Sequence, residues 1–360
     1  MKRLCFILVS LALAGCEPKQ LNDKNEYPAL LSDWGQIWVK GNRLSVNPEA
    51  SVYNLNTPLF SDYAHKLRTV WTPAGATGSV NSDGALNLPV GSVVTKTFYY
   101  RRQEDRLVHA ASEFGKAQGP DLSQVRLLET RVLVRTASGW QGLPYLWNEE
   151  QTNASLDITG GVIPLEVAGL GRFNYIVPDF NQCQGCHVVN VAAGAMQPIG
   201  LTAKHLHKMM QYSGSERNQF EYLAEKHRLT NYETAEYQIS AVWGDDSVSL
   251  ESAARSYLDI NCGHCHSRTG PADTSAMFLT LEENNAIHLG VCKPPVAAGQ
   301  GTGGYLFGID PGRGKQSILT FRMQSDDPGA MMPELGRALV HNEGVALITA
   351  WIDDMAGNCG

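Results

Sequence analysis

The chain reads Cys183-Gln184-Gly185-Cys186-His187 and, further on, Cys262-Gly263-His264-Cys265-His266. Both stretches follow the pattern C-x-x-C-H, in which two cysteines can form thioethers with the vinyl groups of one porphyrin. The histidine that follows is then positioned to ligate the iron. Two copies predict two covalently attached haem c groups, with His187 and His266 as proximal ligands. The predicted haem-binding residues are Cys183, Cys186, His187, Cys262, Cys265 and His266.

Other uses of these residues fit the spacing less well. A zinc ribbon separates its two C-x-x-C pairs by roughly 15–20 residues, and here the pairs are about four times further apart. A thioredoxin-like site would need a βαβ pattern, which neither motif has. The run 299–304 (GQGTGG) matches G-x-G-x-x-G in letters only, because it follows a Lys-Pro-Pro turn rather than a strand. We therefore expect haem and no nucleotide.

The order of helix, C-x-x-C-H, loop, Met-Pro and terminal helix resembles that of small class I cytochromes c. Met332, directly before Pro333, is the expected sixth ligand of the second haem, and Met331 is the alternative. Either methionine could instead fill a gap in the core. Pro271 is the expected source of a carbonyl that orients His266, although a simple turn fits nearly as well.

The sixth ligand of the first haem stays open at this stage. Several residues are candidates, and none is preferred: Met196, His205, His207, Met209, Met210 and Met323. This iron could also lack a protein ligand on its distal side. His227 is interpreted as a residue on a helix face, and His264 as a spacer within the second motif.

The first residues have the layout of an export signal. Lys2 and Arg3 precede an apolar core that is shorter than the roughly 20 residues needed to span a bilayer. The sequence 13–16 (LAGC) resembles a bacterial lipobox, so residues 1–15 are a predicted lipoprotein signal peptide and Cys16 the lipidation site. An ordinary signal cut nearby is the alternative. Glu17, where inner-membrane lipoproteins carry aspartate, favours a periplasm-facing lipoprotein of the outer membrane within the cell envelope.

Two cysteines remain after export and haem attachment. Cys292 and Cys359 are expected to form a disulfide in an oxidising compartment, with two buried free thiols as the alternative. The formal net charge is −7, and removal of the signal makes the chain more acidic. Without a basic stripe, nucleic acid is excluded as a partner. An acidic surface favours a partner with a positive patch.

The pattern along the chain predicts an α+β multidomain fold. Residues 16–43 read as a lipid-anchored linker with a short helix around 27–39. Residues 44–180 read as an antiparallel, sandwich-like β domain, because stretches such as 93–100 and 127–136 are rich in β-branched residues or alternate in polarity. Turn residues separate these stretches.

Helical patterns follow the predicted β domain. Residues 181–245 are the first haem-binding segment, with helices expected at 202–212 and 216–229. Residues 246–360 are expected to form a mainly α-helical, class I-like cytochrome c domain, with helices at 250–261, capped by Ser249, and at 341–355. The Gly/Pro-rich stretch 290–316 is long for a loop, and we expect it to wrap a haem edge.

Several longer stretches carry a resemblance to a family. They are YNLNTPLFSDYAHKLR, VGSVVTKTFYY, LLETRVLVRTASGW, NQCQGCH, YLDINCGHCHSRTGPADTS, GVCKPPVAAGQGTGG and MMPELGRALVHNEGVALITAWI. Together they cover nearly the whole mature chain and resemble uncharacterised bacterial dihaem cytochrome c lipoproteins, often described only as conserved hypothetical proteins. The resemblance implies haem attachment at both motifs and Met332 as a ligand. It implies no activity for the β region.

Three functions follow as hypotheses. The first is electron transfer, in which the haems pass single electrons between a periplasmic redox partner, expected to be a dehydrogenase, and the respiratory chain; no catalytic side chain is then needed. The second is a dihaem peroxidase or oxidase with one open haem. The third is a β module that binds a ligand such as a glycan, with accessory haems.

Overall fold

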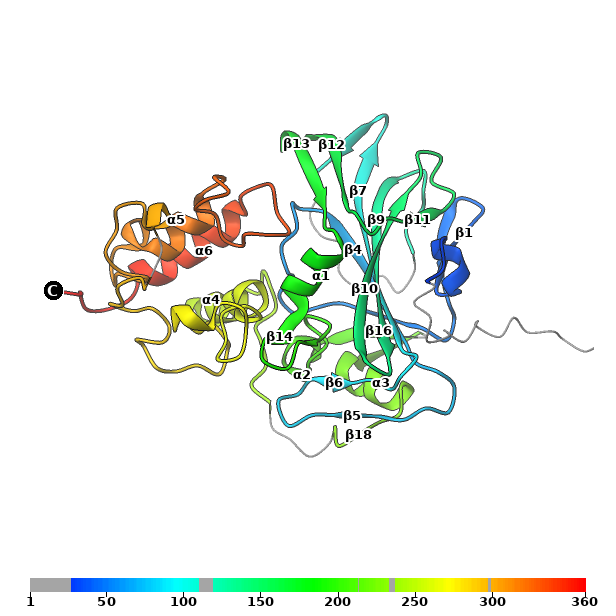
Figure 1. Ribbon diagram of the computed structural model, residues 1–360, viewed down its shortest axis with the longest axis horizontal. Coiled ribbons are helices and arrows are strands. Elements are labelled where there is room, and N and C mark those ends of the chain that lie inside the picture. The colour runs from blue at the N-terminus through cyan, green and yellow to red at the C-terminus, as the bar shows by residue number, and fades with distance from the viewer. Residues whose placement is uncertain (1–26, 110–118, 213, 233–236, 297–298) are drawn as a thin grey trace, which may run out of the picture.

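The computed structural model describes residues 27–109, 119–212, 214–232, 237–296 and 299–360. The predicted signal peptide, the lipidation site Cys16 and the first part of the linker lie outside these residues. Among these residues, strand accounts for 31% and helix for 21%. The molecule is therefore built around β-structure, with one large sheet at its centre (Figure 1).

The central sheet has nine strands. They are β3 (Ser51–Tyr53), β4 (His65–Trp71), β7 (Val93–Gln103), β8 (Arg106–Val108), β9 (Val125–Thr136), β10 (Gly139–Trp147), β11 (Ala154–Leu156), β12 (Gly161–Ala168) and β13 (Gly171–Val177). The order is β11-β10-β9-β7-β8-β12-β13, and β4 pairs with both β3 and β7. All pairs are antiparallel except β8 with β12. The strands predicted at 93–100 and 127–136 are confirmed as parts of β7 and β9.

The sandwich-like arrangement predicted for this region is wrong. The other strands within the described residues form only small sheets of two or three strands. They are β1 (Ile37–Lys40) with β2 (Arg43–Val46), β14 (Val188–Asn190) with β15 (Ala195–Met196), β16 (Met209–Tyr212) with β17 (Ser215–Asn218), and β18 (Leu229–Thr230) with β5 (Gly78–Val80) and β6 (Leu86–Asn87). No second large sheet within the described part of the chain covers the first; helices and hairpins do so instead.

The short helix expected around 27–39 is also wrong. A single 3-10 turn, η1 (Leu31–Trp34), ends where Gly35 adopts a left-handed conformation at φ 64°. The residues that follow, among them the β-branched Ile37 and Val39, then form β1. A left-handed glycine ends a helix at little steric cost, and the chain leaves in an extended direction.

The segment 181–245 holds less helix than the sequence predicted. The helix expected at 202–212 is the four-residue α2 (Ala203–Leu206), followed by the hairpin of β16 and β17. Along β16 the exposed and buried residues alternate, which is the period of a strand. The helix expected at 216–229 is shorter and begins later, as α3 (Gln219–Lys226).

The C-terminal region contains short helices separated by long loops. Ser249 caps α4 (Leu250–Leu258) as predicted, and the helix continues into a π-helical turn, η2 (Asp259–Gly263). The other elements are η3 (Asp273–Ser275), η4 (Gly299–Thr302), η5 (Gly314–Gln316), α5 (Ile318–Gln324) and α6 (Asn342–Asp353). Since the α-helices have 9, 7 and 12 residues, the predicted mainly α-helical, class I-like cytochrome c region is not present, and the predicted fold class is wrong.

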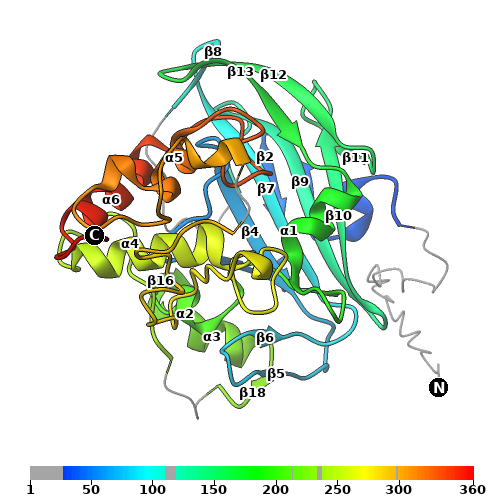
Figure 2. The same cartoon turned by 60° about the vertical axis from the view of Figure 1, so that its left-hand side comes forward.

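One helix connects the sheet to the rest of the molecule. Helix α1 (Phe180–His187) lies against β10, between the sheet and the C-terminal helices (Figures 1 and 2). The core beneath it is continuous across the parts of the chain, because Leu133 of the sheet, Met196 of the hairpin and Ile260 of the π-helical turn belong to one buried cluster. The two C-x-x-C-H motifs therefore share a core with the sheet.

Candidate haem-attachment sites

The first motif forms the second half of α1. Asp179 caps this helix with a capping box: its carboxylate accepts from the Gln182 amide over 2.8 Å, and the Gln182 side chain accepts from the Asp179 amide over 3.1 Å. Cys183 and Cys186 lie three residues apart on the helix, hence on the same face. Gly142 of β10 lies directly beneath them, since a β-carbon there would approach the β-carbon of Cys183 to 3.1 Å.

The second motif lies at the other end of a helix. It follows α4 through the π-helical turn, and the amides of Cys265 and His266 donate to the carbonyl of Cys262 over 3.1 and 2.8 Å. These bonds wrap the motif into a compact turn. The two thiols, Cys262 and Cys265, are again three residues apart.

The two motif histidines are oriented in the same way. His187 Nδ1 donates to the carbonyl of Gln197 over 2.7 Å, and His266 Nδ1 donates to the carbonyl of Met277 over 3.2 Å. A donated Nδ1–H fixes the neutral tautomer and leaves Nε2 with its lone pair free for a metal. The carbonyl that orients His266 is thus that of Met277, and the expectation for Pro271 is wrong.

The motif cysteines are all free thiols, although each pair has the spacing of a redox disulfide. Burial raises the pKa of Cys183 to about 11 and that of Cys262 to about 12. The structure joins Cys292 and Cys359, the pair left over in the sequence, in a disulfide. The four motif thiols therefore remain available for thioether formation.

The two motifs lie side by side. The Val191 amide donates to the carbonyl of Thr269 over 3.0 Å, and the Thr269 hydroxyl donates to the carbonyl of Val189 over 2.7 Å. Val189 comes two residues after His187, and Thr269 three residues after His266. The segments that follow the two motifs are thereby joined, and they hold motifs far apart in the sequence next to each other, an arrangement that the sequence did not reveal.

A loop carrying the predicted sixth ligand faces the second motif. Glu334, two residues after Met332, lies close enough to His266 to affect its pKa, which burial lowers overall. Buried Arg337 holds this loop, because its guanidinium donates to the carbonyl of Met332 over 3.0 Å and to those of Arg322, Ser325 and Leu339. Met331 is buried and Met332 is half-buried. Which of them binds iron stays a prediction.

The loop is also tied to the central sheet. Asp62, just before β4, accepts from the amides of Ala338 and Leu339 over 2.8 and 2.7 Å. Burial raises the pKa of Asp62 despite these bonds. Neither Asp62 nor Arg337 stood out in the sequence, since an isolated charge carries no signal of where it will be buried.

His205 in α2 and His207 at its C-terminus both contact residues outside the two motifs. Both ring nitrogens of His205 have partners: Nε2 lies 2.8 Å from Asp259 and Nδ1 lies 3.2 Å from Ser240 Oγ. Burial would raise the pKa of Asp259, but His205 and Lys204 lower it. His207 contacts Asn218 and packs against the Phe220 ring. Neither histidine is placed toward the first motif by these contacts.

The methionine candidates are placed in different ways. Met196 pairs with Val188 across the β14–β15 hairpin and is buried in the core cluster that contains Leu133. Met209 is exposed and Met210 is buried beside Tyr212, while Met323 belongs to the core of the C-terminal helices.

His264 is the residue that sequence reasoning passed over as a spacer. Its Nδ1 is buried and has no hydrogen-bond partner within the described ranges. It also lies close enough to His187 to contribute to the low pKa of that group, which burial and the Lys96 charge lower to about 3. The second motif therefore presents a side chain toward the first.

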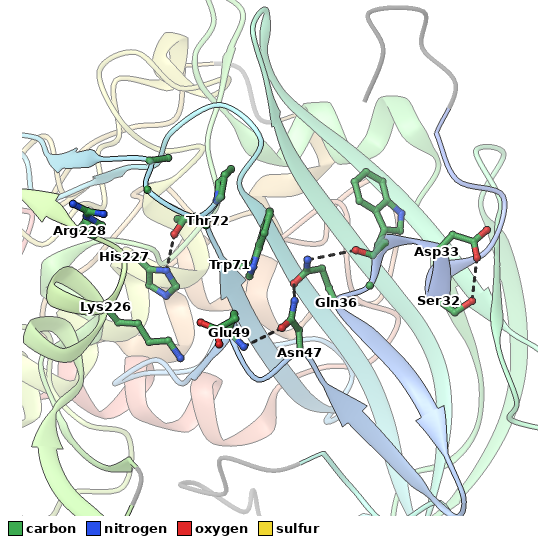
Figure 3. Close-up of a pocket in the computed structure, with 16 residues that line it drawn as sticks. Ser32, Asp33, Gln36, Asn47, Glu49, Trp71, Thr72, Lys226, His227 and Arg228 are labelled. Atoms are coloured by element: carbon green, nitrogen blue, oxygen red, sulfur yellow. Dashed lines mark hydrogen bonds between the residues drawn. The ribbon is translucent and has the colours of Figure 1, made fainter. Parts of the chain in front are cut away.

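A separate cavity of about 630 Å³ lies at the C-terminal end of β4 (Figure 3). Trp71 and Thr72 form part of its wall. The ring of His227 forms two hydrogen bonds, one between Nδ1 and the Thr72 hydroxyl and one between Nε2 and the Ser51 hydroxyl, each 3.0 Å long. Consistent with its assignment to a helix face, His227 is the C-cap of α3 and is buried. None of the residues that line the cavity belongs to either motif.

Comparisons with protein-family models, with curated proteins and with solved structures found no match to this chain. Within the described ranges, no helix has the length and hydropathy required to span a bilayer. In the same residues, no group of three or more His, Cys, Asp or Glu side chains is arranged to hold a metal ion.

The residues at both motifs fit a c-type haem. The fit rests on free paired thiols one helical turn apart and on histidines whose Nδ1 is already bound to a carbonyl. The porphyrin itself supplies four ligands to its iron, so one histidine and at most one further side chain are required of the protein. His187 and His266 would bind iron, and the four cysteines would anchor the porphyrins.

Proposed function

We propose that this chain is an exported dihaem c-type cytochrome that transfers single electrons between a periplasmic redox partner and the respiratory chain. The observation that supports it best is the matched pair of Nδ1-to-carbonyl hydrogen bonds at His187 and His266. Unrelated loops, one ending at Gln197 and one at Met277, orient the two rings in the same way. When bound, haem supplies a reversible one-electron change at iron.

The protein residues set the conditions for that change. The carbonyl bonds to His187 and His266 hold each ring in one orientation and increase the basicity of Nε2. The contact between Thr269 and Val189 keeps the two motifs adjacent, so that an electron received at one has a short route to the other. Proton transfer by a side chain is not required.

The loop held by Arg337 serves the second motif in this proposal. Met332 would provide a thioether, a soft ligand that favours reduced iron and raises the reduction potential. The bond from Arg337 to the Met332 carbonyl fixes the backbone next to that ligand. The second haem is thus the one with the higher potential.

The proposal includes the location and the partner. A lipid on Cys16 would tether the chain to the cell envelope, with the outer membrane favoured and the haems facing the periplasm. The net charge of −7 suits a redox partner, such as a dehydrogenase, that carries a positive patch. Neither a nucleic acid nor a nucleotide is expected as a partner.

A spectroelectrochemical titration of the purified holoprotein tests this function. We expect two one-electron waves, low-spin ferric iron and no turnover of hydrogen peroxide. Met332→Ala should lower the higher of the two potentials, and the matched variant Met331→Ala should leave it within error. A high-spin ferric haem combined with peroxide turnover would instead support the peroxidase or oxidase alternative and overturn the carrier function.

A further inference from the structure

The face of the central sheet that α1 covers carries a row of positive charges. Gly142, beneath Cys183, identifies this face, and it pairs with Leu133 of β9. Residues two positions along each strand lie on the same face. The next row therefore contains Arg131 of β9, which pairs with Lys96 of β7, which pairs with Arg68 of β4.

The neighbouring row adds another cation and one carboxylate. It contains Lys66 of β4, Phe98 of β7 and Glu129 of β9, paired in the same register. Lys66, Lys96 and Arg131 all approach the Phe98 ring, at 5.7, 5.3 and 4.4 Å from its centroid. Three cations thus gather around one aromatic ring, with Arg68 beside Lys96 in the neighbouring row and a single acid among them.

Like charges directly opposite one another on adjacent strands destabilise a sheet. Solvent screens this repulsion only weakly, because Arg68 is 6% exposed and both Lys66 and Lys96 are half-buried. Burial together with Arg131 and Arg68 lowers the pKa of Lys96 to about 7, and burial lowers that of Lys66 well below its usual range. An arrangement that costs this much free energy calls for a compensating negative charge.

The protein compensates only part of the charge. Glu129 binds Arg131 through two bonds of 2.6 and 2.9 Å and accepts from Tyr175 over 2.7 Å. Lys66 donates to the Ala64 carbonyl over 3.1 Å. Within the described residues, the side chains of Lys96 and Arg68 have no hydrogen bond or ion pair.

Two of these cations, the unpaired Lys96 and the paired Arg131, lie beside the first motif. Lys96 and Arg131 both affect the pKa of Cys183, Cys186 and His187, and Lys96 also affects that of His264 in the second motif. This contact between a cationic sheet face and an anchoring motif occurs in a chain whose net charge is negative.

We propose that Lys96, Arg68 and Lys66 form a carboxylate-binding site that receives the two propionate groups of the haem attached at Cys183 and Cys186. Two propionates match the two cations without partners, Lys96 and Arg68, and Lys66 adds a third positive charge beside them. Each propionate would gain a charge-assisted hydrogen bond in a site from which water is largely excluded. The inference rests on the proposed function, because it requires haem at the first motif.

Resonance Raman spectroscopy of the holoprotein tests this assignment, because the propionate bending modes respond to hydrogen bonding at the carboxylates. We expect Lys96→Gln to shift the bending mode of one haem and leave the other unchanged, and to lower one of the two reduction potentials. Lys96→Arg, which keeps the charge, should restore most of both. The exposed Lys40→Gln is the matched control and should change neither.

Haem content separates this inference from the function on which it rests. A wild-type protein without porphyrin refutes the proposed function itself. Two haems with propionate modes identical in wild type and in Lys96→Gln would refute the propionate site alone. Lys66→Gln provides the same comparison if Lys96→Gln does not fold.

A free anion is the other source of the same chemistry. Inorganic phosphate is the probe: if it shifts the potential of wild-type protein and this response is lost in Lys96→Gln, the cations are open to a small anion and the propionate assignment is wrong. No response to phosphate in either protein supports it.

Discussion

The two C-x-x-C-H motifs differ in almost everything except the histidine. The first begins a few residues after a capping box and ends in a β-hairpin on the face of the sheet. The second comes at the end of α4, after a π-helical turn, and continues into a long loop. The cations Lys96 and Arg131 lie beside the first, whereas one cation, Arg322, and one carboxylate, Glu334, lie beside the second. The same five-residue chemistry is thus held in two unlike settings.

That difference identifies which feature is essential. Neither the helix, nor its position, nor the local charge is common to the two motifs. The hydrogen bond that the histidine Nδ1 donates to a backbone carbonyl is common to both, since its length is 2.7 Å in the first motif and 3.2 Å in the second. Orientation of the histidine is therefore the feature that the two motifs share, and under the proposed function the surroundings would adjust each haem separately.

The largest effect is expected from removal of one pair of cysteines. The double variant Cys183→Ala, Cys186→Ala should lose the first haem and keep the second, because each pair anchors its own porphyrin. Cys262→Ala with Cys265→Ala should do the reverse. A pyridine haemochrome assay should give one haem per chain for either variant and two for wild type. Complete loss from one double variant would mean that the motifs are not independent.

The next effect concerns the loop of the second motif. Arg337→Ala removes a donor from four partly buried carbonyl groups, of which, among the described residues, only that of Arg322 keeps another, the Met332 amide. We expect it to lower the free energy of unfolding by about 3 kcal/mol. The near-infrared band of methionine-ligated ferric haem should weaken, with the first haem unchanged. Chemical denaturation and absorption spectra measure both. Arg313→Ala, at an exposed side chain, is the control and should be nearly neutral.

A pH effect is expected from the segment that follows the first motif. Burial lowers the pKa of His227 to about 4, whereas the unfolded chain has a value near 6.5. The unfolded state therefore takes up a proton first as the pH falls. This contribution to stability is complete above about pH 6.5 and is lost toward pH 4, by about 3 kcal/mol in total.

The measurement is the free energy of unfolding of wild type and His227→Gln between pH 4 and 7. The variant should lose stability less steeply than wild type as the medium is acidified. Parallel curves for the two proteins would show that His227 titrates normally in the folded state.

The smallest effect compares the two helix caps. Asp179→Ala and Ser249→Ala should each cost about 1 kcal/mol, because each removes a capping side chain. Only Asp179→Ala should increase amide hydrogen exchange within its own motif, since α1 contains Cys183 whereas α4 ends before Cys262. If both variants increased amide hydrogen exchange equally within their motifs, the two helix caps would not differ in their effect on the motifs.

Local patterns in the sequence predicted local features of the structure. The strands at 93–100 and 127–136 and the Ser249 cap follow from side-chain periodicity and capping chemistry, which act over a few residues. The pairing of Cys292 with Cys359 followed from the assignment of every other cysteine. The two C-x-x-C-H motifs are recognisable because the spacing that haem attachment requires does not depend on the fold.

Long-range arrangement could not be predicted in this way. The expected helix at 202–212 gave way to a hairpin because Met210 and Tyr212 pack into a core that the local sequence does not specify. The contact of Thr269 with Val189, and the register that places Lys96 opposite Arg131, join residues far apart in the chain. Such contacts are decided by tertiary packing, and a single sequence carries little trace of them.

The most direct test of the central claim is the intact mass of the protein produced with cytochrome c maturation enzymes. Covalent attachment at both motifs predicts the mass of the processed polypeptide plus two haems, retained after denaturation in acid. A denatured chain without added porphyrin, and with four reactive thiols at Cys183, Cys186, Cys262 and Cys265, would contradict it.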